Sequence, residues 1–196
     1  MESSSKKLNV GLAITGSFCT FSRILEEASH LIKEKNWNLI PIFSFSTAKT
    51  DTRFGTASDF RKSIVAITGN EPVDSLILAE PLGPKGMLDV IVIAPCTGNT
   101  LAKIANAITD TPVTMAVKAH LRNDKPVVIA LSSNDLLGLN LQNVGVLLPI
   151  KNVYFVPFGQ DDIIKKPKSL ISDYGQIAQT VEKALEGKQI QPLLLR

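Results

Sequence analysis

The sequence predicts an α/β fold, a three-layer Rossmann-like sandwich in which a mostly parallel sheet carries helices on both faces. Two observations predict it. Five short apolar segments alternate along the chain with segments whose apolar residues recur at helical spacing. The third apolar segment, 89–93, is a run of β-branched residues after its first aspartate, which is typical of a strand buried on both faces of a parallel sheet.

The expected strands are 8–14, 38–45, 89–93, 126–131 and 152–158. Pro41 indicates that the second strand is irregular or lies at an edge of the sheet, because proline cannot donate to a strand ladder. Since strands and helices alternate, we expect parallel strands joined by right-handed crossovers.

The first expected helix has one buried face, formed by Phe21, Ile24, Leu25, Ala28, Leu31 and Ile32. Further helices are expected near 57–68, 99–107 and 112–122, mostly within 136–148, and around Ile177, Val181 and Leu185. Segment 46–56 is expected to be a polar loop, and 71–86 a connector rich in turn-forming residues. The hydrophobic tail from about residue 187 is expected to be docked or partly mobile, and 1–196 to form a single domain.

The composition excludes several classes of function. The 196 residues carry 21 basic and 18 acidic side chains without a dense basic stripe, which argues against nucleic acid binding. The two cysteines, Cys19 and Cys96, have no metal-ligand spacing, so we expect no metal and a reduced intracellular protein in which both are small packing residues. No apolar run is long enough for a signal peptide or a membrane span, so a soluble cytoplasmic protein is expected.

Small polar residues lie at the carboxyl ends of four of the predicted strands. They are Thr15, Gly16 and Ser17, then Ser44 and Ser46, then Thr97, Gly98, Asn99 and Thr100, and then Ser132, Ser133 and Asn134. Helix capping explains any one of these clusters. Four clusters at one edge of a sheet, beside a helix N-terminus, favour a site for a phosphorylated cofactor.

The first turn is not a dinucleotide fingerprint. Gly16-Ser-Phe-Cys-Thr20 lacks the G-x-G-x-x-G spacing, and Phe18 is too bulky for close approach of a pyrophosphate. The sequence therefore favours a mononucleotide over NAD(P).

Candidates for binding an anionic substrate come from cations outside these clusters. Arg53 lies in the polar loop, where its guanidinium can bind a carboxylate bidentately or be simply solvated. Lys118, His120 and Arg122 are near one another in sequence and can face one anionic ligand. Cys96 is either redox-active or, as we favour, a packing residue. No residue stands out as an obligate base, so the catalytic residues are unknown.

The helix predicted at 112–122 has apolar residues on more than one face. They are Val113, Met115, Ala116, Val117, Ala119 and Leu121. These residues are either buried within one chain or contact another chain.

A longer motif carries a family resemblance. Ala94-Pro-x-Thr-Gly-Asn-Thr-x-x-Lys-x-Ala-Asn106, followed by Thr109-Asp110, resembles the phosphopantothenoylcysteine decarboxylase-type flavoproteins, and the resemblance covers nearly the whole chain. It implies a Rossmann-like, FMN-binding protein that forms a homotrimer or a larger assembly, with each cofactor site near a subunit boundary. The FMN site would be lined by Gly16, Ser17, Ser44 or Ser46, Thr97 to Thr100, and Ser132.

The chain departs from the decarboxylases of that family at three places. Their catalytic histidine before the third strand has no counterpart in 79–84. Their Pro-Ala-Met-Asn motif is replaced by Leu131-Ser-Ser-Asn134, and their first turn by Gly16-Ser-Phe-Cys19. Decarboxylation of a cysteine-type substrate is therefore not expected.

A narrower resemblance is to one subgroup of the family, the dipicolinate synthase B subunits of endospore-forming bacteria. It is carried by 50–55, 79–85, 133–140 and 155–161. It implies a heteromeric oxidoreductase in the cytoplasm of the sporulating mother cell, where the chain acts with an A subunit that carries NADP. The substrate would be dihydrodipicolinate, its carboxylates countered by Arg53, Lys118 and Arg122. Two alternatives stay open: a catalytically silent partner that stabilises the A subunit, and a flavin-dependent decarboxylase.

Overall fold

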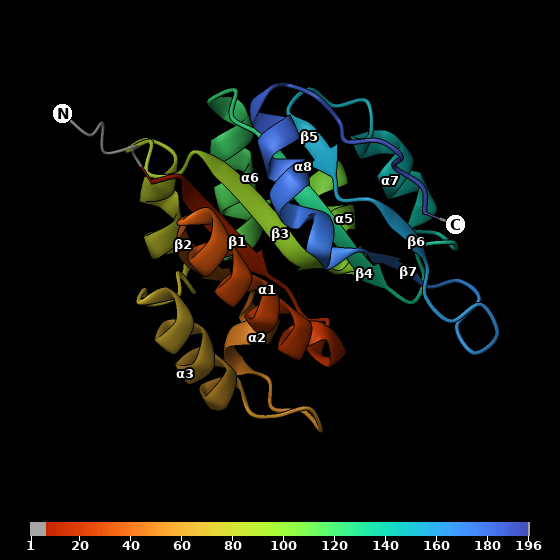
Figure 1. The fold of residues 1–196 in the computed structure, drawn as a ribbon, viewed down its shortest axis with the longest axis horizontal. Coiled ribbons are helices and arrows are strands. Elements are labelled where there is room, and N and C mark those ends of the chain that lie inside the picture. The colour runs from red at the N-terminus through yellow and green to blue at the C-terminus, as the bar shows by residue number, and fades with distance from the viewer. Residues whose placement is uncertain (1–6, 196) are drawn as a thin grey trace.

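The computed structural model describes residues 7–195 and has a seven-stranded sheet between two layers of helices (Figure 1). The strand order is β2-β1-β3-β4-β7-β6, and β5 pairs with β4 beside this path. The parallel strands are β1 (Asn9–Ile14), β2 (Asn38–Phe43), β3 (Val90–Cys96), β4 (Val127–Ser133) and β5 (Val153–Phe155). The predicted three-layer α/β architecture is confirmed.

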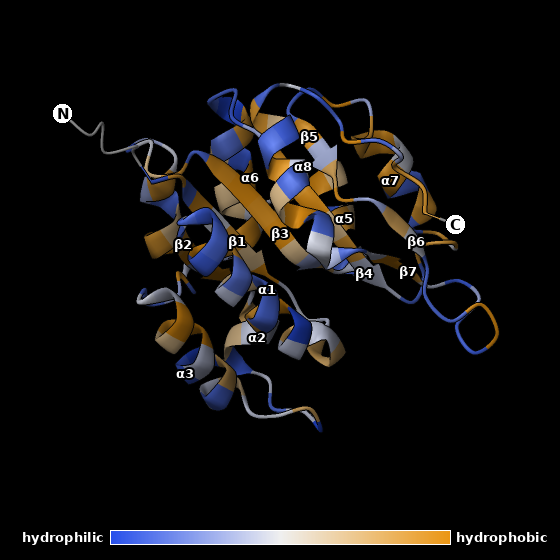
Figure 2. Cartoon of the chain, in the orientation of Figure 1, coloured by the Kyte–Doolittle hydropathy of each residue, from blue (hydrophilic) through white to orange (hydrophobic). Residues whose placement is uncertain are grey.

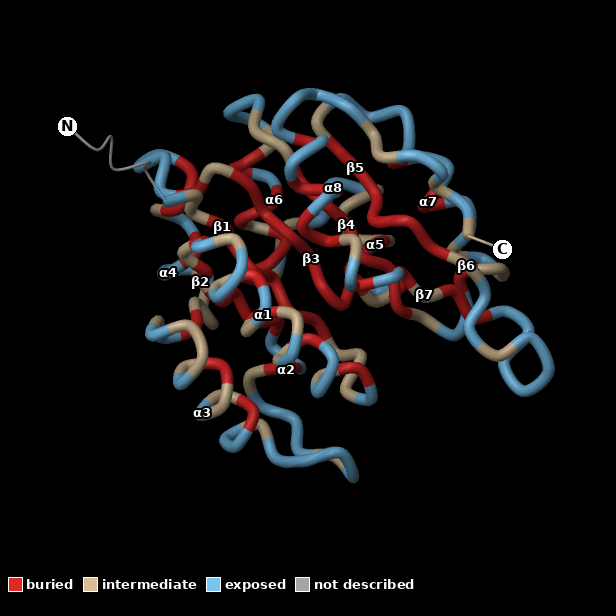
Figure 3. Tube along the Cα trace, in the orientation of Figure 1, coloured by how far each residue is buried: buried red, intermediate tan, exposed pale blue. Residues whose placement is uncertain are grey.

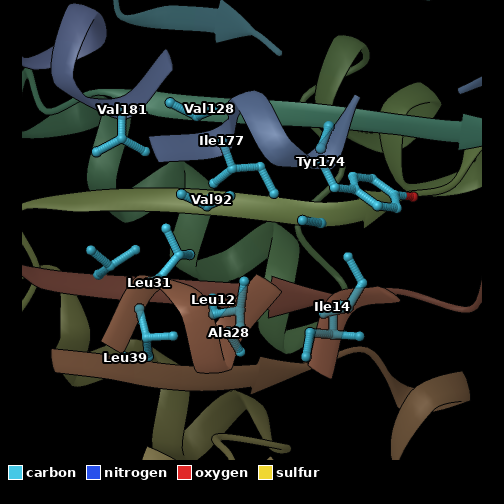
Figure 4. Close-up of a cluster of buried hydrophobic side chains, with 14 of the residues drawn as sticks. Leu12, Ile14, Ala28, Leu31, Leu39, Val92, Val128, Tyr174, Ile177 and Val181 are labelled. Atoms are coloured by element: carbon cyan, nitrogen blue, oxygen red, sulfur yellow. The ribbon is translucent and has the colours of Figure 1, made fainter. Parts of the chain in front are cut away.

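Two hydrophobic clusters hold the layers together, one on each face of the sheet. On one face, α1 (Phe21–Lys35), α3 (Ala57–Thr68) and α8 (Ile177–Leu185) contribute apolar residues to the same cluster as Leu12 and Val92 of the sheet (Figure 4). Since successive strand residues point to opposite faces, Ile91 and Ile93 belong to the other cluster. There they pack with α5 (Gly98–Ala105), α6 (Pro112–Arg122) and α7 (Leu141–Leu147).

The hydropathy of the elements follows these layers. The central strands are mostly apolar, and β3 is apolar along its length, whereas α1 presents polar residues to solvent (Figure 2). The same strands form the buried centre of the molecule (Figure 3). Pro41 lies in β2, which is an edge strand as its proline predicts.

Several short elements differ from the sequence-based expectation. The expected polar loop at 46–56 begins with a short helix, α2 (Phe45–Lys49), and the connector 71–86 contains α4 (Leu76–Ala79) and the 3₁₀ turn η2 (Glu80–Leu82). Strand β3 continues through Pro95 to Cys96, with a register shift against β4 after Ile93. Elements this short contain too few residues to show a period of apolar residues, so the sequence pattern does not predict them.

The region after β5 departs most from expectation. The strand expected at 152–158 is divided into β5 and β6 (Phe158–Gln160), and β6 forms an antiparallel hairpin with β7 (Leu170–Ser172). Strand β7 in turn pairs with the last two residues of β4. The tail lies along this edge, where the Phe158 N–H donates to the Leu193 carbonyl (3.0 Å) and the Leu195 N–H to the Phe158 carbonyl (2.9 Å).

Helix α6 is covered on more than one side within a single chain. Val113, Ala116, Val117 and Ala119 are buried, and the helix packs against α5, the strands and the α4–η2 segment. The apolar faces of 112–122 are therefore mostly core, and they do not by themselves indicate contact with another chain.

Gly83 allows this packing, and its replacement gives a stability prediction. A Cβ on Gly83 would lie 2.5 Å from the Cβ of Ala119 and 3.3 Å from its Cα. Neither atom can rotate away, so Gly83→Ala is expected to lower the free energy of unfolding by about 1–3 kcal/mol. Urea denaturation measures the change. Gly145→Ala is the control, since a Cβ there has nothing within 4 Å, and equal unfolding midpoints for the two variants would contradict the packing.

Candidate functional site

A cleft of about 470 Å³ lies at the carboxyl ends of β1, β3 and β4. Three of the four predicted clusters contribute to its wall, through Gly16, Ser17, Thr97, Gly98, Asn99, Ser132, Ser133 and Asn134. The other lining residues come from the first turn, the 50–56 loop, Asp135 and the β6–β7 hairpin: Phe18, Cys19, Thr20, Phe54, Asp161, Lys166, Ser169 and Ile171. The volume is in the range of cofactor and ligand sites.

Thr15 holds the first and third of these clusters together. Its hydroxyl donates to the carbonyl of Pro95 (2.7 Å) and accepts from the N–H of Thr97 (3.0 Å). Thr97 in turn caps α5, because its side chain accepts from the N–H of Thr100. The turns after β1 and β3 are therefore fixed relative to each other before any ligand binds.

Ser17 and Ser132 join the first and fourth clusters. Their hydroxyl oxygens are 2.8 Å apart, and Ser132 is buried whereas Ser17 is partly open to the cleft. The hydroxyl of Thr20 donates to the Ser17 carbonyl (2.8 Å) and fixes the 3₁₀ turn η1 (Phe18–Thr20). This pair of hydroxyls forms one wall of the cleft.

Gly98 lies against a network that begins at Asp135. The Asp135 carboxylate accepts from the Ser133 hydroxyl (2.6 Å) and from the Asn140 amide (2.5 Å). A Cβ on Gly98 would lie 2.8 Å from the Asp135 carboxylate and 2.8 Å from the Asn140 amide. This carboxylate thus lies beside the N-terminus of α5, where negative charge is favourable.

Lys166 and Asp161 form the far wall, on the loop between β6 and β7 that projects from the molecule (Figure 1). Their Nζ and Oδ2 atoms are 2.8 Å apart, and this bond raises the pKa of Lys166 above its ordinary value. Lys166 is the one cation among the described lining residues, against the carboxylates of Asp135 and Asp161. The wall therefore carries more negative than positive charge.

Phe18 separates the cleft from a smaller cavity of about 210 Å³. Its ring packs against Phe21, whose ring stacks on Phe60. Phe54 also lines both cavities. A Cβ on Gly16 would lie 3.5 Å from the Phe18 ring and 3.3 Å from the Cβ of Ser46, so Gly16 lies in a narrow gap between these two side chains.

Two residues expected to bind the cofactor are buried and do not line the cleft. Ser44 is buried and caps α2, accepting from the N–H of Thr47. Thr100 is also buried, and its hydroxyl pairs with Thr97. Ser46 is exposed beside Gly16, so of Ser44 and Ser46 the latter is the one near the cleft.

The expected substrate-binding cations are dispersed within one chain. Arg53 is exposed and does not line the cleft, but its guanidinium is 4.9 Å from the centre of the ring of Phe54, which does. Lys118 and Arg122 are exposed on α6, and His120 between them is buried. The last turn of α6 leads into β4 and so lies at the amino ends of the strands, away from the cleft. The expectation that Arg53, Lys118 and Arg122 bind one substrate is therefore not met within a single chain.

The cysteines differ from each other. Cys96 is fully buried, and burial raises the pKa of its thiol far above the ordinary range, so it is a packing residue as favoured from the sequence. Cys19 is exposed and lines the cleft, contrary to its expected packing role. No cluster of His, Cys, Asp or Glu in residues 7–195 has the arrangement of a metal site.

Sequence reasoning missed several lining residues. Asp161, Lys166 and Ser169 reach the cleft only because the β6–β7 hairpin returns to β4, a long-range pairing with no local signal. Asp135 did have a signal, because it directly follows the polar cluster at the end of the fourth strand.

Asn99 gives a prediction that separates binding from folding. It is exposed, lines the cleft and does not cap α5, since Thr97 does. Asn99→Ala is expected to weaken binding of FMN, measured by flavin fluorescence, without lowering the unfolding midpoint. Asn106→Ala, at the other end of α5, is the control. If Asn99→Ala instead unfolds the protein and leaves affinity unchanged, its role is structural.

Comparison with known proteins agrees with this fold. The model of the family described as Flavoprotein matches residues 1–185. The chain therefore belongs to the Flavoprotein family. It is 47% identical over 193 residues to the B subunit of dipicolinate synthase from Bacillus subtilis, covering 98% of this chain and 96% of the relative.

Two solved structures have the same fold as this chain. The crystal structure of the dipicolinate synthase B subunit from Bacillus halodurans superposes with a TM-score of 0.88 at 46% identity, with 96% of each chain covered. The FMN-dependent cysteine decarboxylase SpaF shares the fold, with a TM-score of 0.65 at 22% identity, covering 91% of this chain and 97% of SpaF. No helix within residues 7–195 is long and apolar enough to cross a membrane.

Proposed function

We propose that this chain is the B-type subunit of a two-subunit dipicolinate synthase, an oxidoreductase that acts with an A subunit on dihydrodipicolinate during sporulation. The reaction removes a hydride equivalent and a proton from the dihydropyridine ring, and the aromaticity of the product favours it. The observation that carries the proposal is the near-full-length similarity to two proteins of that name. We also propose that the reaction takes place in the cytoplasm of the mother cell, as the resemblance to the subgroup implies.

We propose FMN as the cofactor of this cleft. The hydroxyls of Ser17 and Ser46, both beside Gly16, would donate to its phosphate. Thr97, Asn99 and Ser132, which line the cleft, would contact the ribityl chain and the polar edge of the ring. When bound, a flavin supplies the capacity to accept a hydride equivalent. NADP is expected on the A subunit.

The charge of the cleft favours a site shared between chains. A dicarboxylate needs cations, but Lys166 is already paired with Asp161, and Arg53 does not line the cleft. Additional positive charge must come from another chain, either the A subunit or a second copy that brings Lys118 and Arg122 to the cleft. We therefore also propose a homotrimer or larger assembly, and a monomer in sedimentation of the isolated chain would leave the A subunit as the source of that charge.

A catalytically silent partner of the A subunit is the second candidate. The segment 79–84 has no histidine that could act as an acid or base. Cys96 lies beside the cleft but is fully buried, so its thiol cannot react with a ligand there. For the same two reasons, a flavin-dependent decarboxylase is the least favoured of the three candidate functions.

Reconstitution tests the proposal and separates it from the silent partner. Dipicolinate formation is measured with the A subunit alone, this chain alone and the two together, and we expect full activity only from the pair. Asn99→Ala is then added as a variant that still binds the A subunit. Loss of activity with retained binding supports a working cleft. Retained activity indicates a silent partner, and an A subunit that is fully active alone contradicts the proposal.

A further inference from the structure

The ion pair between Lys166 and Asp161 lies on the wall of the cleft and is open to solvent. The Lys166 Nζ and Asp161 Oδ2 atoms are 2.8 Å apart, and the two side chains are 48% and 33% exposed. Both residues line the cleft, and Lys166 is the one cation among the lining residues that the structure describes. An ion pair this exposed contributes little to stability, so it can open at low cost.

The backbone around Lys166 is fixed, so its side chain is the part that can move. The Lys166 N–H donates to the Asp162 carbonyl (2.7 Å), and the Lys166 carbonyl accepts from the Ser169 N–H (2.9 Å). The Leu137 N–H, just after β4, donates to the Lys168 carbonyl (3.0 Å) and ties this loop to the body of the molecule. The Lys166 ammonium therefore reaches the cleft on a flexible four-carbon stem from an anchored backbone.

The two carboxylates of the cleft differ in how firmly they are held. One Asp135 oxygen accepts from the Ser133 hydroxyl (2.6 Å) and the other from the Asn140 amide (2.5 Å). The Asp161 carboxylate has Lys166 as its one hydrogen-bond partner among residues 7–195. Asp161 can therefore turn to water without breaking a second hydrogen bond, whereas Asp135 cannot.

We propose that Lys166 binds a carboxylate of the substrate by exchanging it for Asp161, and that Asp161 thereby makes the cleft selective for dicarboxylates. In the empty cleft, Asp161 neutralises the Lys166 ammonium. Replacing one carboxylate by another at the same ammonium gains little, so a monocarboxylate is not favoured. A dicarboxylate binds because its second carboxylate contacts a further cation, which another chain supplies.

This inference rests on the proposed function, because that function supplies the dicarboxylate and a phosphate site at Ser17 and Ser46. Its test is equilibrium binding of dipicolinate, measured by calorimetry on the purified chain and on its complex with the A subunit. Binding is measured without turnover, so the result does not depend on catalysis. FMN is titrated separately, because a phosphate is the other oxyanion that a lysine can bind.

Lys166→Gln is expected to weaken dipicolinate binding about tenfold, the size of one hydrogen bond between charged groups, and to leave FMN affinity unchanged. Lys166→Arg keeps the positive charge and should restore most of the dipicolinate affinity. Lys165→Gln is the matched control, because Lys165 is the preceding residue of the same loop, is exposed and does not line the cleft. It should bind dipicolinate as the wild type does.

Asp161→Asn is expected to act in the opposite direction. It removes the competing charge and keeps the size of the side chain, so dipicolinate should bind about twofold to fivefold tighter. Picolinate, which has one carboxylate, should gain affinity as well. Both gains should disappear in the Lys166→Gln background, because no ammonium is left to be released. A general effect of negative charge would instead persist in that background.

Four results would overturn the exchange. They are wild-type dipicolinate affinity in Lys166→Gln, an equal gain from Asp161→Asn with and without Lys166, no dipicolinate binding by either the chain or the complex, and a Lys166→Gln effect on FMN alone. The last result would assign Lys166 to a phosphate. The proposed function fails separately, when the two subunits form no dipicolinate although Lys166→Gln and Asp161→Asn change its binding as expected.

Discussion

Gly98→Ala is expected to abolish most of the ligand affinity of the cleft while the chain stays folded. The added Cβ would lie 2.8 Å from the Asp135 carboxylate, 2.8 Å from the Asn140 amide and 3.0 Å from the Ser133 hydroxyl. All three are ends of side chains that can move, so the fold survives, but the network that shapes this wall must rearrange. We expect FMN affinity to fall by about tenfold or more, equivalent to at least about 1.4 kcal/mol.

Gly145→Ala is the matched control, because Gly145 is also in a helix and has open space around it. It should keep the wild-type affinity and gain slightly in stability, as alanine does over glycine within a helix. FMN titration with a urea unfolding curve on each variant measures both quantities. Wild-type affinity in Gly98→Ala would mean that the Ser133–Asp135–Asn140 network does not form part of the binding wall.

His120 is expected to make the protein sensitive to acid. Burial, with a smaller contribution from the nearby Lys125, lowers its pKa from 6.5 to about 4, although Asp89 acts in the opposite direction. The unfolded chain therefore binds more protons than the folded chain between these values. Stability is thus complete above about pH 6.5 and falls as the pH drops toward 4, by up to about 3 kcal/mol.

His120→Gln should remove this part of the pH dependence. The free energy of unfolding, measured by urea denaturation from neutral pH to pH 4, should change less in the variant than in the wild type. His30→Gln is the control substitution, because the side chain of His30 is half-exposed. If the free energy of unfolding falls equally with pH in His120→Gln and in the wild type, then His120 takes up its proton in the folded state.

The parts of the site that sequence predicts are those set by local physics. A buried β-branched strand, a threonine cap and a following helix are short-range features, so β3, Thr97 and α5 could be placed from the sequence alone. The same local signal cannot separate capping from binding, since both use hydroxyls at a strand end. Ser44 and Thr100 therefore resembled ligand residues although they satisfy backbone and neighbouring hydroxyls.

The remaining differences between the predicted and the observed site depend on tertiary structure. Lys166 reaches the cleft through a hairpin whose strands have three residues each, too few to show a period. Lys118 and Arg122 could have been placed better from the predicted topology, because a crossover helix runs antiparallel to its strands and its last turn lies at their amino ends. Their proximity in sequence to His120 suggested a shared site, but helix geometry points them away from that buried side chain.

Titration of the purified chain with FMN, followed by flavin fluorescence, tests the central claim that this cleft is a flavin site. We predict saturable binding of one flavin per chain that inorganic phosphate competes away and that Asn99→Ala weakens. A folded chain that leaves flavin fluorescence unchanged up to the highest soluble FMN concentration would contradict the claim.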